Sequence, residues 1–243
     1  MAGSNACRPL EGDERSVRRP KASRLPRGLY VLTPEIDDDD WLVAAVAAAI
    51  RGGASTVQYR NKRLAPDARL RQARRIHDTC AQRGAAFIVN DSVELAARLG
   101  ADGVHLGRDD GDLAAARAAL GPDAVIGVSC YDSFERALET RERADYCAFG
   151  SVFPSAVKPD AVRAPLDLFA RARDAGLHAV AIGGIDADNA GEVAAAGAAA
   201  IAVITAVFGD VSGRIGPSVI EDDARRLLEA FEAPHSACRG TSA

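Results

Sequence analysis

Eight short runs of β-branched or aromatic residues alternate along the chain with stretches rich in Ala, Leu and Arg that have helical spacing. The runs predict strands at residues 29–33, 55–59, 86–89, 103–106, 125–128, 146–149, 178–182 and 200–203. The stretches between them predict helices that include residues 67–83, 92–99, 113–120, 134–143, 166–175 and 189–196. A further helix is expected after the acidic run 37–40, and a last helix at 220–231 follows the eighth run. Glycines stand where five of these helices should stop.

This alternation predicts an α/β fold made of one (β/α)8 TIM barrel, in which eight parallel strands close into a barrel and the helices form an outer layer. The length of 243 residues suits such a barrel. An open doubly wound sheet is the alternative, but the first run ends in Thr33-Pro34-Glu35 and not in a GxGxxG turn. Residues 27–232 are assigned to the barrel. Residues 1–26 are expected to be a mobile basic leader, and residues 233–243 a flexible tail.

The composition argues against several classes of protein. The formal net charge of −4 argues against a general nucleic-acid-binding protein. No apolar run approaches the roughly 20 residues that are needed to cross a bilayer, so no membrane association is expected. The five cysteines are scattered without a CxxC pair, and the N-terminus lacks the apolar core of a secretory signal, so a cytoplasmic protein with reduced thiols is expected. The sequence leaves open whether the chain forms a homo-oligomer.

Polar residues and glycines gather at the carboxyl ends of the predicted strands, which is where the chemistry of a TIM barrel takes place. Gln58, Arg60 and Lys62 alternate at the end of the second strand, so all three are expected to face the barrel mouth. Two cations on one face suit a phosphate or diphosphate, because arginine binds it in a bidentate manner and lysine adds a point charge. Solvated surface charge is the alternative interpretation.

Oxygen ligands follow the third and fourth strands. Asn90 and Asp91 end the third strand, and Asp109 and Asp110 follow the fourth. Such sparse carboxylates suit Mg²⁺, which keeps several waters and shares its ligand shell with substrate phosphates. Asp91 and Asp110 are the predicted ligands, and Asp109 is the competitor for the second position. The alternative for Asp91 is that it caps the helix that begins near Ser92.

The seventh and eighth strands end in groups that suit a phosphate. The Gly183-Gly184 turn, together with Ile204-Thr205, resembles the phosphate site often found after strands seven and eight of TIM barrels. In such sites, backbone N–H groups and a helix start hold the anion. A tight turn alone would also explain the two glycines.

The fifth and sixth strands lead to hydroxyl groups and one more cation. Ser129 ends the fifth strand, and Ser155 and Lys158 lie in the long connection 150–164, which is a candidate lid. His105 could act as a base, but an inward-facing histidine at a strand end is interpreted here as structural. Two anion sites and one metal site predict substrates that carry several phosphate charges.

Taken in order, these segments resemble the signatures of the thiamine-phosphate synthase family, also called thiamine-phosphate pyrophosphorylases. The resemblance covers nearly the whole barrel, from Gly28 to about Phe208, and the ordered set is far more specific than an isolated IGGI turn. The matching segments are Val57-Gln58-Tyr59-Arg60-Asn61-Lys62, Val89-Asn90-Asp91, Gly103-Val104-His105-Leu106-Gly107-Arg108-Asp109-Asp110, Gly127-Val128-Ser129 and Ala181-Ile182-Gly183-Gly184-Ile185.

The resemblance implies a transferase that joins 4-amino-2-methyl-5-hydroxymethylpyrimidine diphosphate to 4-methyl-5-(2-hydroxyethyl)thiazole phosphate. The products would be thiamine phosphate and pyrophosphate, with Mg²⁺ assisting a dissociative departure of pyrophosphate. The electron-rich pyrimidine ring stabilises the cation that such a departure leaves, and nearby cations stabilise the leaving charge without a covalent intermediate.

The resemblance also implies a role for each matching residue. The pyrimidine diphosphate would be bound by Gln58, Arg60, Lys62, Asn90, Ser129 and Lys158. The thiazole phosphate would be bound by Ser155, Gly184, Ile204 and Thr205. Mg²⁺ would be held by Asp91 and Asp110. The catalytic contribution would come from Arg60, Lys62, Ser129 and Lys158.

Departures from the family pattern define two alternatives. Arg108 and Val157 replace the usual glutamine and threonine, and they put diphosphate binding and thiazole-phosphate affinity in question. A non-catalytic sensor of thiamine intermediates is therefore one alternative. A thiazole tautomerase-like isomerase is the other, although the histidine that would follow Ser129 in such an enzyme is Cys130 here.

Overall fold

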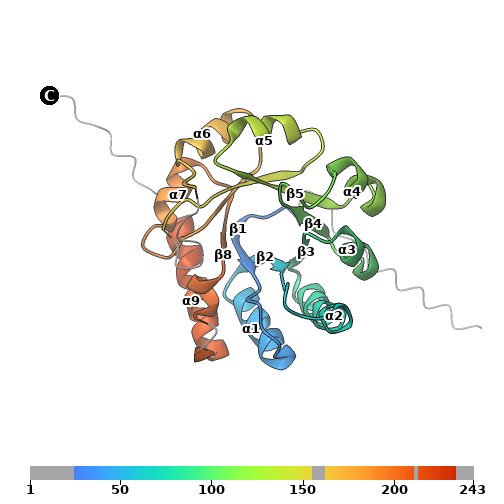
Figure 1. Cartoon of the computed structure of the whole chain (residues 1–243). Coiled ribbons are helices and arrows are strands. Elements are labelled where there is room, and N and C mark those ends of the chain that lie inside the picture. Colours follow the sequence, from blue (N-terminus) through green and yellow to red (C-terminus); the bar gives the residue numbers. More distant parts are fainter. Residues whose placement is uncertain (1–24, 155–161, 211–212, 234–243) are drawn as a thin grey trace, which may run out of the picture.

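The computed structural model describes residues 25–154, 162–210 and 213–233, and its eight parallel strands close into one barrel in chain order (Figure 1). The (β/α)8 prediction is therefore confirmed. The strands are β1 (Gly28–Leu32), β2 (Ala54–Tyr59), β3 (Ala86–Asn90), β4 (Gly103–Leu106), β5 (Val125–Tyr131), β6 (Tyr146–Phe149), β7 (Ala179–Ile182) and β8 (Ala200–Val203). The predicted leader 1–26 and tail 233–243 lie outside the described residues, apart from residues 25, 26 and 233.

Helices surround the barrel and follow the strands in sequence (Figure 1). They are α1 (Asp39–Arg51), α2 (Pro66–Arg83), α3 (Val93–Leu99), α4 (Leu113–Leu120), α5 (Phe134–Thr140), α6 (Asp167–Asp174), α7 (Ala190–Ala196), α8 (Thr205–Phe208) and α9 (Pro217–Glu232). Side-chain oxygens of four residues cap helix starts by accepting main-chain N–H hydrogen bonds, as expected for the residue types Asp38, Ser92, Asp112 and Ser133. The short helix α8 was not predicted.

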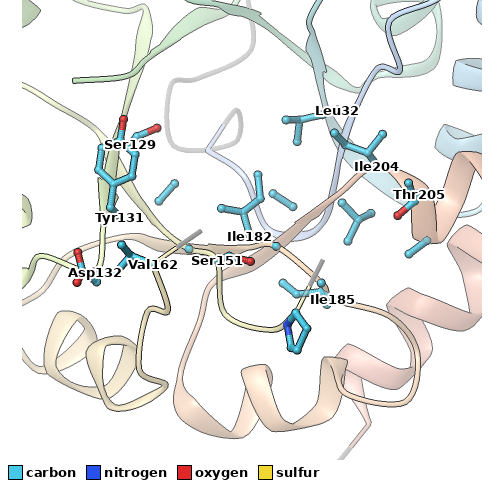
Figure 2. Close-up of a pocket in the computed structure, with 18 of the residues that line it drawn as sticks. Leu32, Ser129, Tyr131, Asp132, Ser151, Val162, Ile182, Ile185, Ile204 and Thr205 are labelled. Atoms are coloured by element: carbon cyan, nitrogen blue, oxygen red, sulfur yellow. The ribbon is translucent and has the colours of Figure 1, made fainter. Parts of the chain in front are cut away.

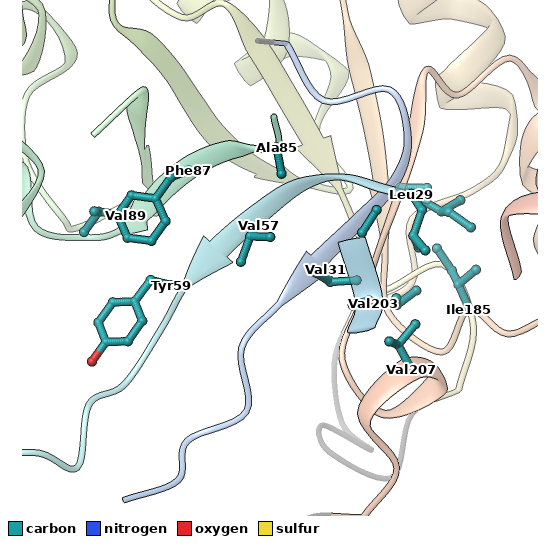
Figure 3. Close-up of a cluster of buried hydrophobic side chains, with 14 of the residues drawn as sticks. Leu29, Val31, Val57, Tyr59, Ala85, Phe87, Val89, Ile185, Val203 and Val207 are labelled. Atoms are coloured by element: carbon teal, nitrogen blue, oxygen red, sulfur yellow. The ribbon is translucent and has the colours of Figure 1, made fainter. Parts of the chain in front are cut away.

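Alternate residues of each strand face opposite sides of the barrel wall, because side chains of a strand alternate. The outward-facing set packs with helix residues in one buried cluster, whose members Leu29, Val31, Val57, Tyr59 and Phe87 are labelled on their strands in Figure 3. A second buried cluster fills the barrel interior and consists of Tyr30, Leu32, Ile88, Val125, Tyr146, Ala148, Val180, Ala200 and Ala202. The barrel is therefore a packed core, and any binding site must lie at one of its ends.

At the amino end of the barrel, two aspartate side chains accept hydrogen bonds from main-chain N–H groups of neighbouring strands. Asp102 Oδ2 accepts a hydrogen bond of 2.9 Å from the Phe87 N–H. Asp145 Oδ2 accepts hydrogen bonds from the Ile126 N–H at 2.7 Å and from Arg117 Nη2 at 2.6 Å. None of the helices in the described ranges is long and apolar enough to cross a membrane.

Candidate active site

The carboxyl end of the barrel opens into a cavity of about 870 Å³ (Figure 2). Residues that follow β2, β4, β5, β6, β7 and β8 line it. Five of the predicted site residues are in this lining, namely Arg60, Ser129, Gly184, Ile204 and Thr205. Ser155 and Lys158, which the sequence also assigned to the site, lie outside the described residues.

The part of the cavity formed by β6, β7 and β8 is built from glycines and neutral hydroxyls. Gly183 and Gly184 have φ angles of +101° and +68°, which residues with a Cβ rarely adopt. A Cβ on Gly184 would overlap the Pro154 carbonyl oxygen, so the chain segments approach closely here because glycine has no side chain. Ser151 and Thr205 face the same space in Figure 2. This half of the mouth offers a glycine turn and the hydroxyls of Ser151 and Thr205, and its lining also includes the Asp186 carboxylate.

The two predicted cations at the end of β2 are each paired with a carboxylate. Arg60 Nη1 lies 2.5 Å from Glu35 Oε1, and Lys62 Nζ lies 2.6 Å from Asp91 Oδ2. The prediction that both cations bind one anion stays a prediction, and within the chain each cation is paired with a carboxylate. The physical reason is that opposite charges at this distance attract strongly, and the carboxylates come from adjoining loops.

A smaller cavity of about 340 Å³ lies beside β2 and β3. Its lining includes three predicted site residues, Lys62, Asn90 and Asp91. The site residues are thus divided between two cavities. Asp110 connects them, because its carboxyl group interacts with that of Asp91 and it follows Arg108 and Asp109, which line the larger cavity.

The carboxyl groups of Asp91 and Asp110 lie close enough for each to shift the pKa of the other. Burial tends to raise the pKa of Asp91, but hydrogen bonds with Lys62 and Asp110 outweigh it and lower that pKa. Desolvation and the neighbouring Asp91 raise the pKa of Asp110. Two carboxyl groups in contact repel each other when both are ionised, so a cation between them would stabilise both.

The local backbone supports a functional interpretation of Asp91. Ser92, and not Asp91, caps α3, since Ser92 Oγ accepts the Leu95 N–H at 3.1 Å. The helix-cap alternative for Asp91 is thereby excluded. Asp91 also has a φ of 62°, a conformation that costs energy for a residue with a side chain and that clusters at functional sites. Within the described ranges no three His, Cys, Asp or Glu side chains converge, but Mg²⁺ is commonly held by one or two carboxylates plus substrate phosphates, which fits this pair.

Gln58 lies deeper than predicted, inside the barrel and only 3% exposed. Its Nε2 donates to the Tyr30 hydroxyl at 2.6 Å. The expectation that Gln58 lies at the mouth beside the two cations is wrong, because β2 still runs inside the barrel at this residue. Burial raises the pKa of Tyr30 to about 12, so this hydroxyl keeps its proton at neutral pH.

His105 is buried below the mouth, and its Nε2 lies within hydrogen-bond distance of Ser129 Oγ, at 2.9 Å. Burial lowers the pKa of His105 to about 4, against the opposing effect of the Asp91 carboxylate, so the imidazole is neutral at pH 7. A neutral buried imidazole that contacts a cavity residue agrees with the structural role predicted for it.

Several cavity residues were missed by the sequence interpretation. Ser151 follows β6 directly and could have been found by the rule that site residues follow strands. Tyr131 is the last residue of β5 and Asp132 follows it, and Tyr131 has a φ of 57° that no sequence pattern indicated. Arg108, expected to add a cation beside the metal loop, lies over the Tyr131 ring with Cζ 4.8 Å from its centroid.

Comparisons with known proteins identify the family. The model of a family described as thiamine monophosphate synthase matches residues 29–207. The thiamine-phosphate synthase of Chromobacterium violaceum is 59% identical over 182 residues, which cover 74% of this chain and 88% of that protein. The thiamine-phosphate synthase of Aromatoleum aromaticum is 54% identical over 184 residues, covering 75% of this chain and 88% of that protein.

A solved structure gives the same result in three dimensions. The thiamine phosphate pyrophosphorylase from Pyrococcus furiosus superposes with a TM-score of 0.68 at 33% sequence identity, covering 85% of this chain and 98% of that one. The family resemblance inferred from the sequence is therefore confirmed. The chain belongs to the thiamine monophosphate synthase family of enzymes.

Proposed function

We propose that the chain transfers a pyrimidylmethyl group from 4-amino-2-methyl-5-hydroxymethylpyrimidine diphosphate to 4-methyl-5-(2-hydroxyethyl)thiazole phosphate, giving thiamine phosphate and pyrophosphate. Family membership supports the reaction. The single observation that carries the proposal is that one barrel mouth has two chemically different halves. The half at β2–β5 has cations and carboxylates, and the half at β6–β8 has a glycine turn and hydroxyls.

The half at β2–β5 suits the diphosphate. Arg60 and Lys62 would exchange their carboxylate partners for phosphate oxygens, with Asn90 beside them. Asp91 and Asp110 would hold Mg²⁺, which when bound neutralises charge on the diphosphate. Gln58 lies below the mouth, and its side chain would contact the pyrimidine end of the substrate where that end enters the barrel.

The half at β6–β8 suits the thiazole phosphate. The Gly183-Gly184 turn brings main-chain groups into the cavity where a side chain would not fit, and Thr205 adds a hydroxyl. Ile204 would contact the thiazole ring through its apolar side chain. Ser155 is proposed for the same phosphate on the family resemblance alone.

The chemistry is an exchange at one carbon atom. The bond between the methylene carbon and the diphosphate oxygen breaks, and its electron pair leaves with pyrophosphate. The lone pair of the thiazole nitrogen then forms the new C–N bond, so no general base is required. Arg60, Lys62 and Lys158 would stabilise the charge that develops on the leaving group, and Ser129 would donate a hydrogen bond to it.

The decisive experiment is turnover of the full chain with both substrates and Mg²⁺, followed by chromatography of thiamine phosphate and an assay of pyrophosphate. Equal amounts of the two products are expected, with no product when either substrate is omitted. Tight binding of both substrates without product would favour the sensor alternative. Isomerisation of a thiazole tautomer without transfer would favour the isomerase alternative.

The remaining partners and the location are proposed on the same grounds. Small molecules are the expected partners, and nucleic acids and membranes are not, in line with the net charge of −4. A cytoplasmic location is proposed because Cys130 and Cys147 are buried thiols that form no disulfide.

A further inference from the structure

A chain of four hydrogen bonds crosses the interior of the barrel and ends at two proposed substrate-binding residues. Gln58 Nε2 donates to the Tyr30 hydroxyl at 2.6 Å, and the Tyr30 hydroxyl lies 3.0 Å from that of Tyr146. The Tyr146 hydroxyl lies 3.0 Å from His105 Nδ1, and His105 Nε2 lies 2.9 Å from Ser129 Oγ. The residues come from β2, β1, β6, β4 and β5, so the chain of hydrogen bonds connects opposite sides of the barrel. We call it the interior relay.

Packing holds the relay in one geometry. The Tyr30 and Tyr146 rings meet edge to face with centroids 6.2 Å apart, and the His105 and Tyr146 rings stack at 5.5 Å. A Cβ on Gly127 would overlap the Tyr146 ring, so this glycine provides the space that the ring occupies. Tyr30 and Tyr146 are no more than 2% exposed, so water does not compete for their hydroxyl groups.

The donors and acceptors allow only one direction along the relay. The Tyr30 oxygen accepts from Gln58, so the Tyr30 proton must be donated to Tyr146, which is its one other polar partner in the described structure. The Tyr146 proton is then donated to His105 Nδ1. A neutral imidazole has one N–H group, so it lies on Nε2 and is donated to Ser129. The Ser129 proton is left free to be donated elsewhere.

We propose that Tyr30, Tyr146 and His105 are positioning residues that, through this directional relay, make the Ser129 hydroxyl a hydrogen-bond donor toward the mouth cavity. Ser129 lines that cavity, and a donor there suits a phosphate oxygen, which only accepts. The opposite direction would turn the Ser129 proton toward His105 and present a lone pair to the anion. The inference rests on the proposed function for the identity of the anion, whereas the direction of the relay does not depend on it.

The direction can be read without a ligand from the ¹⁵N NMR shifts of the histidine ring in the full-length protein. His105 is expected in the Nε2–H form. In Gln58→Glu, a group that can only accept once it is ionised replaces the donating amide, so the relay should reverse and His105 should change to the Nδ1–H form as the pH is raised and this buried carboxyl group ionises. His77 and His178, which lie outside the relay, are internal controls and should keep their shifts. An Nδ1–H form of His105 in the parent protein would overturn the proposal, as would an Nε2–H form retained in the folded variant once the ¹³C shift of the new carboxyl group shows that it is ionised.

A double-mutant cycle tests whether Tyr146 acts through Ser129. The probe is inorganic pyrophosphate with Mg²⁺, measured by calorimetry on the parent, Tyr146→Phe, Ser129→Ala and the double variant. Each single change should weaken binding by about 3- to 10-fold, the range for one neutral hydrogen bond. The double variant should bind no more weakly than Ser129→Ala, because the relay has no other route to the anion.

The controls separate the relay from the proposed function. Thr79→Val removes another buried hydroxyl, which donates to the Arg75 carbonyl within α2 and lines neither cavity, and should leave pyrophosphate affinity unchanged. Additive losses in the double variant would show that Tyr146 does not act through Ser129. A parent protein that does not bind pyrophosphate at all would contradict the proposed diphosphate site, and the NMR result would still decide the direction of the relay.

Discussion

At the amino end of the barrel, Asp102 and Asp145 accept hydrogen bonds from main-chain N–H groups of neighbouring strands. At the mouth, Asp91 instead pairs with Lys62 and interacts with Asp110, which also accepts the Gly107 N–H of its own loop at 2.8 Å. Both ends therefore use the same residue type, but with different partners. A carboxylate that binds main-chain N–H groups stabilises the fold, because its partners cannot leave. A carboxylate that binds a lysine and another carboxyl group can change partners when a ligand arrives. This difference predicts opposite effects of substitutions at the two ends.

The largest effect is expected from the carboxyl pair at the mouth. Asp91→Asn and Asp110→Asn each remove one anionic ligand proposed for Mg²⁺, and each should reduce the turnover rate at limiting Mg²⁺ by about 10²- to 10³-fold, the size typical for loss of one preorganised electrostatic contact. Rates measured over a Mg²⁺ titration test this. Asp109→Asn is the matched control and should keep the parent's Mg²⁺ requirement. If Asp109→Asn shows the larger defect, the second ligand is Asp109.

The amino end should respond in stability and not in activity. Asp145→Ala removes the acceptor for both the Ile126 N–H and Arg117, so the free energy of unfolding should fall by about 2–4 kcal/mol. Urea denaturation measures the loss, and the specific activity of the folded fraction should stay at the parent level. Asp174→Ala removes an exposed carboxylate paired with Arg173 and should change stability by less than about 0.5 kcal/mol. An Asp145→Ala variant that keeps its stability but loses activity would contradict the purely stabilising role of the amino end.

Alanine variants of two glycines distinguish the effect of backbone strain from the effect of losing the phosphate site. Gly184 and Gly176 have similar φ angles of +68° and +72°, but a Cβ on Gly176 would meet no atom within 4 Å. Both Ala variants should lose about 1 kcal/mol of stability from the left-handed conformation alone. Only Gly184→Ala should also raise the KM for the thiazole phosphate, by about tenfold or ~1.4 kcal/mol, because its Cβ displaces the Pro154 segment. Equal KM values for the thiazole phosphate in the two variants would show that the Gly183-Gly184 turn is not part of the phosphate site.

The smallest effect is expected from His178, which lies at the amino end where its Nε2 meets the Pro26 carbonyl at 2.5 Å. Burial lowers the pKa of His178 below its usual 6.5. The unfolded chain therefore binds this proton more readily, and the stability that the neutral form contributes is complete above pH 6.5 and is lost as the pH falls through the folded pKa. Denaturant unfolding at pH 7.5, 6 and 5 should show a steeper decline for the parent than for His178→Gln. Parallel pH profiles would contradict the depressed pKa.

The sequence was sufficient for the barrel because its signals are local and repeated. Each strand is a short apolar run, and glycines at Gly84, Gly100 and Gly197 end helices in the left-handed conformation that was expected of them. The helix α8 was missed because four residues are too few to show a helical period. The family could be predicted because its motifs stand in the expected order.

The contacts within the site could not be predicted, because they join distant parts of the chain. Nothing in the sequence shows that Glu35, 25 residues before Arg60, is its ion-pair partner. The meeting of Tyr30 and Tyr146, 116 residues apart, depends on the closure of the barrel and on the space left by Gly127. The strand period predicts which side chains point inward, but it does not predict which of them touch.

The two ion pairs at the end of β2 have a consequence for how the enzyme discriminates between anions. On the proposed roles, Arg60 and Lys62 each give up an internal counter-ion when the diphosphate arrives, so binding is an ion exchange whose free energy is the difference between two sets of charge contacts. A weakly charged anion such as a monophosphate gains little from such an exchange, whereas a diphosphate replaces both carboxylates at once. The internal carboxylates therefore favour ligands of high charge density, because only such ligands bind the two cations more strongly than the carboxylates do.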